Sequence, residues 1–215
     1  MPNDLEIDFI KGPFGYRRRR LDRGEPLLRA IGLRGQKGLK VADATAGLGR
    51  DGFLMAAAGA DVVLVERSPE VFQRLKDALE KAASAGEDLA AIAGRIQLIC
   101  GDAREVLQGR EVDAILVDPM HPERRNSALV KKEMRDLRLL VGSDPDRDDL
   151  IRSMLRLPAG RVVVKWPLHG PLPEDLPRPS FEIAAKTVRY SVFVGASNRP
   201  PARDPLTGSG AAGEG

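Results

Sequence analysis

Apolar and polar positions recur along this chain with two different periods, which predict strands and helices in turn. Short runs of Val, Ile and Leu predict strands at residues 40–44, 61–65, 96–100, 113–117, 161–165, 180–186 and 188–194. Apolar positions three or four residues apart predict helices near residues 25–31, 50–58, 69–83, 87–93, 103–107, 133–141 and 146–157. Because helices separate the first five strands, these strands are expected to lie parallel in one sheet.

The last two strands depart from this pattern. Residues 188–194 alternate between apolar and other side chains, and too few residues precede them for a crossover helix, which predicts an antiparallel hairpin. The fold class is therefore α/β, with a Rossmann-like seven-stranded sheet that is mostly parallel and ends in a C-terminal antiparallel hairpin. We expect a basic N-terminal extension at residues 1–38, the α/β domain at residues 39–197 and a disordered tail at residues 198–215.

A glycine-rich turn follows the first predicted strand and leads into a helix. In the stretch Val41-Ala-Asp-Ala-Thr-Ala-Gly-Leu-Gly-Arg-Asp-Gly52, Gly47 and Gly49 lack the Cβ atoms that would keep a ligand from the backbone, and both can adopt a positive φ. The second predicted strand leads to Glu66, nineteen positions after Gly47, where an acidic residue can bind ribose hydroxyls. Together these features predict a nucleotide-cofactor site of the Rossmann type.

The charge around this turn distinguishes between two cofactors. Residues Gly47 to Gly52 satisfy the G-x-G-x-x-G pattern of NAD enzymes, but a pyrophosphate needs backbone N–H donors with no carboxylate close by. Asp43, Asp51 and Glu66 all fall at or near the turn. S-adenosylmethionine carries a sulfonium and an ammonium and has no phosphate, so the acid-rich turn favours this cofactor. The alternatives are a dinucleotide, or a glycine turn that only lets a helix pack on a strand.

Length and composition restrict the class of protein. The 215 residues suffice for one well-buried domain, and no stretch of 18 apolar residues could span a membrane. The N-terminus lacks the layout of a secretory signal, and the single cysteine, Cys100, is expected to be a small buried apolar side chain without a disulfide. We therefore expect a cytoplasmic protein with no membrane partner. Two histidines and one cysteine cannot assemble a zinc cluster, so no metal is expected.

Basic residues are concentrated near the N-terminus. Nine Lys or Arg residues lie between positions 11 and 37 against two acidic ones, although the net charge of the chain is only +3. This asymmetry suggests a polyanionic partner. Its centre is the run Arg17-Arg-Arg-Arg20, beside which Phe14 and Tyr16 are candidates for stacking on bases. A solvated arm that only aids solubility is the alternative.

A second candidate site follows the fourth predicted strand. This strand runs into Asp118-Pro-Met-His-Pro122, which places a carboxylate where open α/β sheets bind ligands. The segment resembles the Asp/Asn-Pro-Pro-aromatic motif of methyltransferases that modify exocyclic amines of bases. Such an amine is a poor nucleophile because its lone pair is delocalised into the ring, and acceptors for its hydrogens localise that pair and aim it at the methyl group. An Asp-Pro turn that merely ends a strand is the alternative.

Further motifs agree with one family in order and spacing. They are Asp8-Phe9, Tyr16-Arg-Arg18, Asp43-Ala-Thr-Ala-Gly-Leu-Gly-Arg-Asp51, Leu64-Val-Glu-Arg67, Ser127-Ala-Leu-Val-Lys-Lys-Glu-Met-Arg135, Leu139-Leu-Val-Gly142 and Arg161-Val-Val-Val-Lys165. Over about residues 7–195, the chain resembles the bacterial 16S ribosomal RNA guanine-N2 methyltransferases of the J type. The resemblance implies a class I methyltransferase domain that moves a methyl group from S-adenosylmethionine to the N2 of a guanine in small-subunit ribosomal RNA.

The motifs and this resemblance together name the site residues. Cofactor contacts are expected at Asp43, Gly47, Gly49, Arg50, Asp51, Glu66, Arg67, Asp102, Ala103 and Asp118. Asp118 is expected to orient the amine, with Pro119 and His121 as a platform for the base, although the family usually has an aromatic where His121 stands. Phosphate contacts, to ribosomal RNA or the assembled small subunit, are expected at Arg17, Arg18, Arg19, Arg20, Lys131, Lys132 and Arg135. The alternatives are a methyltransferase acting on another RNA, a protein or a small molecule, and a non-catalytic RNA-binding protein of the same fold.

Overall fold

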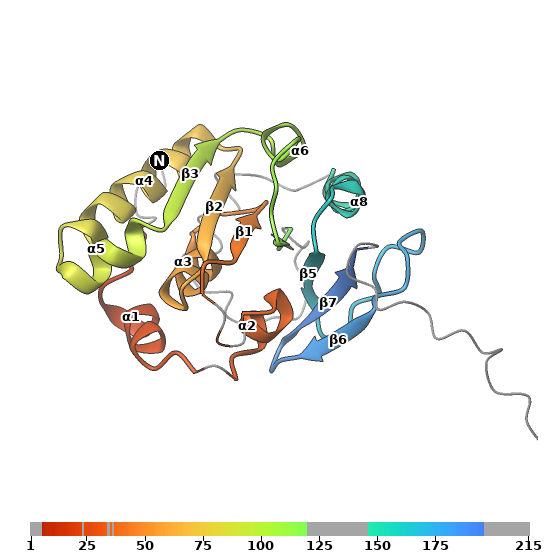
Figure 1. Ribbon diagram of the computed structural model, residues 1–215, viewed down its shortest axis with the longest axis horizontal. Coiled ribbons are helices and arrows are strands. Elements are labelled where there is room, and N and C mark those ends of the chain that lie inside the picture. The colour runs from red at the N-terminus through yellow and green to blue at the C-terminus, as the bar shows by residue number, and fades with distance from the viewer. Residues whose placement is uncertain (1–5, 23, 34, 36, 120–145, 196–215) are drawn as a thin grey trace, which may run out of the picture.

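A seven-stranded sheet forms the centre of the computed structural model, which describes residues 6–22, 24–33, 35, 37–119 and 146–195 (Figure 1). The strands are β1 (Lys40–Asp43), β2 (Asp61–Glu66), β3 (Ile96–Cys100), β4 (Ala114–Val117), β5 (Arg161–Pro167), β6 (Phe181–Ala184) and β7 (Val188–Val194). Their order across the sheet is β3-β2-β1-β4-β5-β7-β6. The first five strands pair in parallel, and β7 is antiparallel to both β5 and β6. The predicted sheet and its C-terminal hairpin are therefore confirmed.

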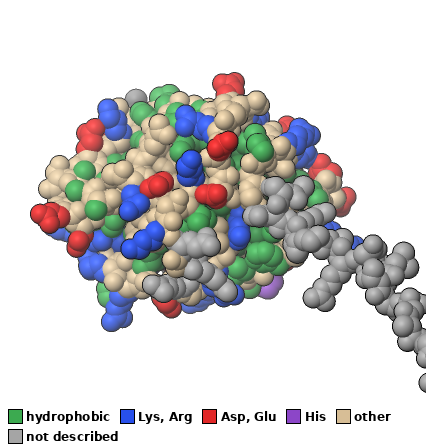
Figure 2. Space-filling view, viewed as in Figure 1, with side chains coloured by type: hydrophobic (Ala, Val, Ile, Leu, Met, Phe, Trp, Pro, Cys, Tyr) green, Lys and Arg blue, Asp and Glu red, His purple; other side chains and the backbone are tan. Residues whose placement is uncertain are grey.

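Helices connect the strands. They are α1 (Gly12–Arg19), α2 (Pro26–Ile31), α3 (Arg50–Ala57), α4 (Pro69–Ala83), α5 (Glu87–Ala93), α6 (Ala103–Val106) and α8 (Arg147–Arg156). The apolar pattern predicts all of these except α1, whose sequence is dominated by arginine and carries no apolar stripe. Lys and Arg side chains gather over the corner of the molecule that α1 forms (Figure 2). The predicted helix at 133–141 and the predicted tail at 198–215 lie outside the described residues.

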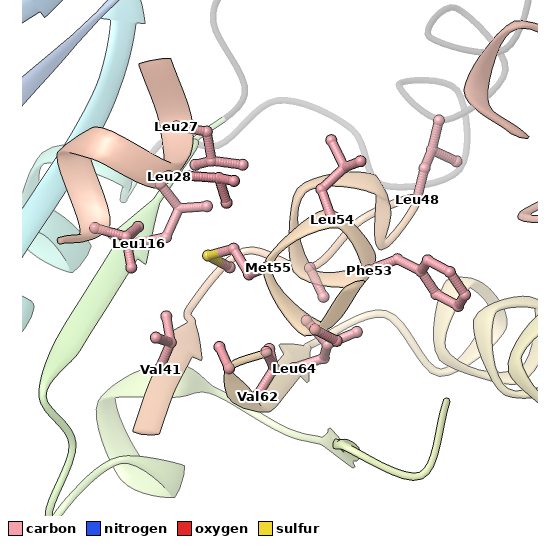
Figure 3. Packing of buried hydrophobic residues seen from close by; sticks show 14 of the residues in the cluster. Leu27, Leu28, Val41, Leu48, Phe53, Leu54, Met55, Val62, Leu64 and Leu116 are labelled. Atoms are coloured by element: carbon pink, nitrogen blue, oxygen red, sulfur yellow. The ribbon is translucent and has the colours of Figure 1, made fainter. Parts of the chain in front are cut away.

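Side chains that alternate along the strands build one apolar core on each face of the sheet. On one face, Leu64 of β2 and Leu116 of β4 pack with residues of α2, α3 and α4 (Figure 3). On the other face, Ile115 and Val117 of β4 pack with residues of α6 and α8. Because both faces are covered, the strands read as nearly continuous apolar runs, which is why the sequence predicts them well.

The N-terminal segment packs into the larger of these cores. Phe9 stacks on Phe53 of α3 with ring centroids 4.3 Å apart, and Phe14 meets both rings edge to face. Phe14 is only 8% exposed, so the expectation that it stacks on bases is wrong, because the ring is buried against two other aromatic rings. Tyr16 is 55% exposed. The domain boundary expected at residue 38 stays a prediction.

Two expectations drawn from composition concern Cys100 and the membrane. Cys100 ends β3, an edge strand whose residues are only partly covered, and its side chain is exposed. The expectation of a buried cysteine is therefore wrong, since an apolar run at the edge of a sheet does not guarantee burial. In the described part of the chain, no helix is long and apolar enough to cross a membrane.

Candidate active site

Acidic side chains line one edge of the sheet. Asp43 ends β1, Glu66 ends β2, Asp102 follows β3 and Asp118 follows β4. The carboxyl ends of parallel strands meet at the same edge, so residues far apart in the sequence are brought together there. Asp51, in the first turn of α3, adds a further carboxylate to this group.

Three backbone donors of the glycine turn are already occupied within the protein. The Ala46 N–H donates to the Val65 carbonyl at 3.0 Å, and the Gly49 N–H donates to the Ala46 carbonyl at 2.7 Å. The Gly47 N–H donates to Oε2 of Glu66 at 2.8 Å. A pyrophosphate bound here would need such N–H groups, so the turn does not suit a dinucleotide. Its acidic surroundings suit a cofactor that carries positive charge and no phosphate.

Packing accounts for two of the glycines in the motif. Gly49 has a φ of +67°, and a Cβ atom there would lie 2.5 Å from Cδ1 of Leu75. A Cβ atom on Gly52 would overlap Cδ2 of Leu64 on β2. The alternative interpretation, in which glycine lets a helix pack closely, therefore applies to Gly49 and Gly52. The contacts expected between the cofactor and Gly47 and Gly49 stay a prediction.

Glu66 is fixed by the turn that it follows. It is 6% exposed, and its two carboxylate oxygens accept hydrogen bonds from the backbone N–H groups of Gly47 and Ser68, each at 2.8 Å. A carboxylate oxygen can accept more than one hydrogen bond, so these two contacts do not preclude hydrogen bonds from ribose hydroxyls. The geometry is compatible with the role expected for Glu66.

Lys165 of β5 links the glycine turn to the segment after β4. Its Nζ lies 2.6 Å from Oδ2 of Asp51 and 2.7 Å from Oδ2 of Asp118. Burial lowers the pKa of Lys165, but Asp118 and Asp51 together raise it well above its ordinary value, so the side chain remains an ammonium. Tyr190 of β7 pairs with Lys165 across the ladder. Burial, aided by Asp51, raises the pKa of Tyr190, and its hydroxyl stays protonated.

Asp43 lies buried beside these charges. Its Oδ1 accepts the Thr45 N–H at 3.0 Å, and the Thr45 hydroxyl accepts the Asp118 N–H at 2.7 Å. Burial raises the pKa of Asp43 to about 7, and the charges of Asp51 and Asp118 add to the rise. Thr45 therefore connects the end of β1 to the segment after β4, and Asp43 exchanges its proton near neutral pH.

A second group of charges surrounds Asp102. Arg104 contacts the Asp102 carboxylate through Nε at 2.9 Å and reaches Asp146, which precedes α8, at 2.8 Å. Arg67, after β2, also pairs with Asp146, at 3.0 Å. Hydrogen bonding to Arg104 lowers the pKa of Asp102, so Asp102 is ionised. Ala103 is buried at the start of α6. This network joins the ends of β2 and β3 to the start of α8.

The basic run on α1 lies near the acidic edge. Arg17 pairs with Glu25 at 2.6 Å, and the charges of Glu25 and Asp51 raise its pKa against the effect of burial. Arg20 lies over the ring of Tyr16 at 5.0 Å. The exposed Tyr16 ring therefore already has a cationic partner within the protein. Arg18 is partly exposed, and Arg19 and Arg20 are exposed.

The remaining predicted residues divide between described and undescribed parts of the chain. Arg50 begins α3 and is partly buried, and Pro119 is buried directly after Asp118. His121, Lys131, Lys132 and Arg135 lie outside the described residues, so their predicted roles stay predictions. Within the described ranges, no group of three or more His, Cys, Asp or Glu side chains could hold a metal ion.

Sequence reasoning missed Lys165, Thr45, Tyr190, Arg104 and Asp146. Lys165 did carry a signal, because a lysine that interrupts an otherwise apolar central strand must find a counter-charge. Its partners could not be named, since they come from α3 and from the segment after β4. Thr45 lies inside the glycine motif itself, where its hydroxyl has no distinctive pattern.

The fold and this acid-lined edge define a class of protein. Residues 2–195 match the model of a family described as "Putative SAM-dependent methyltransferase". Among solved structures, a SAM-dependent methyltransferase from Neisseria gonorrhoeae is 27% identical with a TM-score of 0.67, covering 88% of this chain and 74% of that chain. The chain is therefore a class I methyltransferase whose cofactor is S-adenosylmethionine, as predicted.

Closer relatives define the family within this class. Ribosomal RNA small subunit methyltransferase J of Rhodopseudomonas palustris (strain TIE-1) is 52% identical over 189 residues, covering 87% of this chain and 93% of the relative. The protein of the same name from Agrobacterium fabrum is 46% identical over 189 residues, covering 87% of this chain and 91% of the relative. The chain belongs to the ribosomal RNA small subunit methyltransferase J family, and the predicted family is confirmed.

Proposed function

We propose that this protein transfers a methyl group from S-adenosylmethionine to the N2 amine of a guanine in 16S ribosomal RNA. The observation that carries the proposal is Asp118, which follows a central strand and is held by Lys165 next to the acid-rich glycine turn. The relatives are named as methyltransferases of small-subunit ribosomal RNA. Base amines need a positioned acceptor of this kind.

The described residues fit the cofactor in its separate parts. Glu66 would accept hydrogen bonds from the ribose, and Asp102 and Ala103 would flank the adenine. Asp43 and Asp51 would face the positively charged amino-acid end, with Gly47, Gly49, Arg50 and Arg67 around them. When bound, S-adenosylmethionine supplies an electrophilic methyl group: the amine lone pair forms the N–C bond, the C–S pair passes to the sulfonium sulfur, and the nitrogen releases one proton.

Asp118 has two tasks in this reaction. Its carboxylate accepts an amine hydrogen, which localises the nitrogen lone pair and aims it at the methyl group. It then accepts the proton that the nitrogen releases and passes it to water, since its side chain is 36% exposed. Pro119 restricts the backbone that follows, so that the acceptor stays in place. We assign the platform for the base to Pro119 and His121.

The basic residues are proposed to hold the RNA backbone. Arg17 to Arg20, at the C-terminal end of α1, would contact phosphates together with Lys131, Lys132 and Arg135, either of free 16S ribosomal RNA or of an assembled small subunit. A guanine in a duplex or tight loop must be swung out of its stack to reach Asp118. A substrate of this kind places the protein in the bacterial cytoplasm.

The experiment is to incubate the purified protein with labelled S-adenosylmethionine and 16S ribosomal RNA, and then to digest the RNA and identify the product by mass spectrometry. N2-methylguanosine at a single position is expected. Label on another base, a protein or a small molecule would refute the substrate and leave the cofactor assignment intact. RNA binding without any methyl transfer would favour a non-catalytic RNA-binding protein.

A further inference from the structure

The register of the sheet makes Lys165 and Asp118 neighbours. Val117 of β4 pairs with Val164 of β5, so the next residue on each strand continues side by side. Side chains alternate along a strand, so both point to the face on which Leu116 and Val163 pack. Asp51 reaches the same ammonium from α3, which covers that face. Lys165 therefore ties the segment after β4 to the cofactor turn.

The ammonium occupies only part of the Asp118 carboxylate. Nζ of Lys165 contacts Oδ2, whereas Oδ1 accepts no hydrogen bond from any residue that the structure describes. The Lys165 and Asp118 side chains are 20% and 36% exposed, so the pair is partly desolvated while the carboxylate remains accessible. Such an ion pair restrains the rotation of the carboxylate.

An ionised carboxylate can accept hydrogen bonds but cannot donate them. The Watson–Crick edge of guanine presents two adjacent donors, N1–H and the N2 amine. Adenine and cytosine instead present an amine donor beside a ring nitrogen that is an acceptor. Only the guanine edge makes both contacts with a carboxylate favourable, whereas a protonated acid or an amide can also match the mixed edge.

We propose that Lys165 is a positioning residue that holds the Asp118 carboxylate turned toward the base, and that this makes the site select the guanine amine over the amines of other bases. The inference rests on the proposed function and adds to it the basis of base selection. It assigns Lys165 no contact with the substrate. Its effect reaches the reaction through the orientation of Asp118.

The test places guanine or 2-aminopurine at the methylated position of a synthetic 16S RNA fragment. The analogue keeps the N2 amine, but its N1 is an acceptor. The wild-type protein is expected to prefer guanine by about a hundredfold or more in kcat/KM, because the mismatched edge leaves two acceptors facing each other. Lys165→Met is expected to lower kcat for guanine by about tenfold or more, to leave KM for RNA nearly unchanged and to narrow the preference by about tenfold.

Conservative variants separate positioning from folding. Lys165→Arg keeps the positive charge and should retain most of the preference for guanine over 2-aminopurine. Asp118→Asn introduces a hydrogen-bond donor and should narrow that preference. Lys76→Met, which removes a surface lysine that pairs with Glu80 on α4, is the matched control and should change neither kcat nor the preference.

The outcomes distinguish this proposal from the function on which it rests. If folded Lys165→Met keeps the wild-type preference for guanine, the role of Lys165 is wrong and the methyltransferase function stands. If Lys165→Met does not fold, an unchanged preference in Asp118→Asn overturns the proposal equally. If the wild-type protein methylates no guanine, the proposed function itself fails.

Discussion

At the scale of single residues, the acids of the site differ in the charged groups that surround them. Asp51 and Asp118 share the ammonium of Lys165, and Asp102 is bound by Arg104. Asp43 is 3% exposed and lies near two other carboxylates, and its pKa rises to about 7. The pKa of Asp102 is therefore lowered and that of Asp43 is raised, although the sequence presents the two acids alike.

Asp43→Asn is expected to flatten the pH dependence of stability. The folded pKa of about 7 lies above the ordinary aspartate value of 3.8, so between these values the folded state binds a proton that the unfolded state has lost. The contribution of Asp43 to the free energy of unfolding therefore falls as pH rises from about 4 to 7, by on the order of 4 kcal/mol. Urea unfolding of the wild-type protein and of Asp43→Asn between about pH 4 and pH 7 measures this change in the free energy of unfolding. Identical pH profiles for the two proteins would contradict the prediction.

Asp118→Ala is expected to lower methyl transfer by about a hundredfold or more, because it removes an acceptor used mainly in the transition state. RNA affinity should change little, since a phosphate-dominated interface does not depend on this carboxylate. Single-turnover transfer and filter binding measure the two effects. Asp77→Ala, which removes an exposed carboxylate of α4 that binds Gln73, is the control. Turnover of Asp118→Ala within about threefold of wild type would exclude the proposed role.

At the scale of elements, the start of α3 depends on close packing as much as on cofactor binding. Gly49 begins the helix in a left-handed conformation and faces Leu75 of α4, while Gly52 lies against Leu64 of β2. Two of the three glycines in the motif thus serve the packing of α3 against α4 and β2, and α3 carries Asp51, which contacts Lys165. The sequence predicts the turn but not which of its glycines are needed for packing.

Gly49→Ala is expected to destabilise the protein by roughly 2 to 4 kcal/mol, from the left-handed backbone and the overlap with Leu75. Gly109→Ala is the matched control, since Gly109 has a φ of +70° and no atom within 4 Å of an added Cβ. The free energy of unfolding of Gly109→Ala should fall by only about 1 kcal/mol. Denaturant unfolding compares the two variants. Equal losses would show that backbone conformation, and not packing against α4, is what requires Gly49.

At the scale of the whole molecule, a basic corner lies beside an acidic edge. Phe9 and Phe14 anchor the N-terminal segment on Phe53, so α1 is held against the domain that contains the site. From this position, Arg17 is close enough to Asp51 for the charge of Asp51 to raise the pKa of Arg17. A polyanion bound at the α1 corner (Figure 2) would therefore lie near the start of α3, which carries Asp51.

Replacing Arg17 to Arg20 with alanine is expected to weaken RNA binding for all sequences and to flatten its dependence on salt. Each lost phosphate contact releases about one fewer counterion, so the slope of log K against log salt falls by about 0.9 per contact. Arg17 already pairs with Glu25 and should contribute less than the others. Arg152→Ala is the control, because Arg152 binds Asp149 and Asp175. If the quadruple variant keeps the wild-type slope of log K against log salt, the RNA binds a surface other than Arg17 to Arg20.

The sequence by itself determined the succession of strands and helices along the chain, except for α1, together with the glycine turn and the acids at the strand ends. These follow from local periodicity and from the short-range constraints of a turn, which neighbouring residues carry. Only the tertiary structure decided that Lys165 lies between Asp51 and Asp118, and that Phe14 is buried. Such contacts join residues far apart in the chain, and their partners are fixed by strand order and register, which no local pattern encodes.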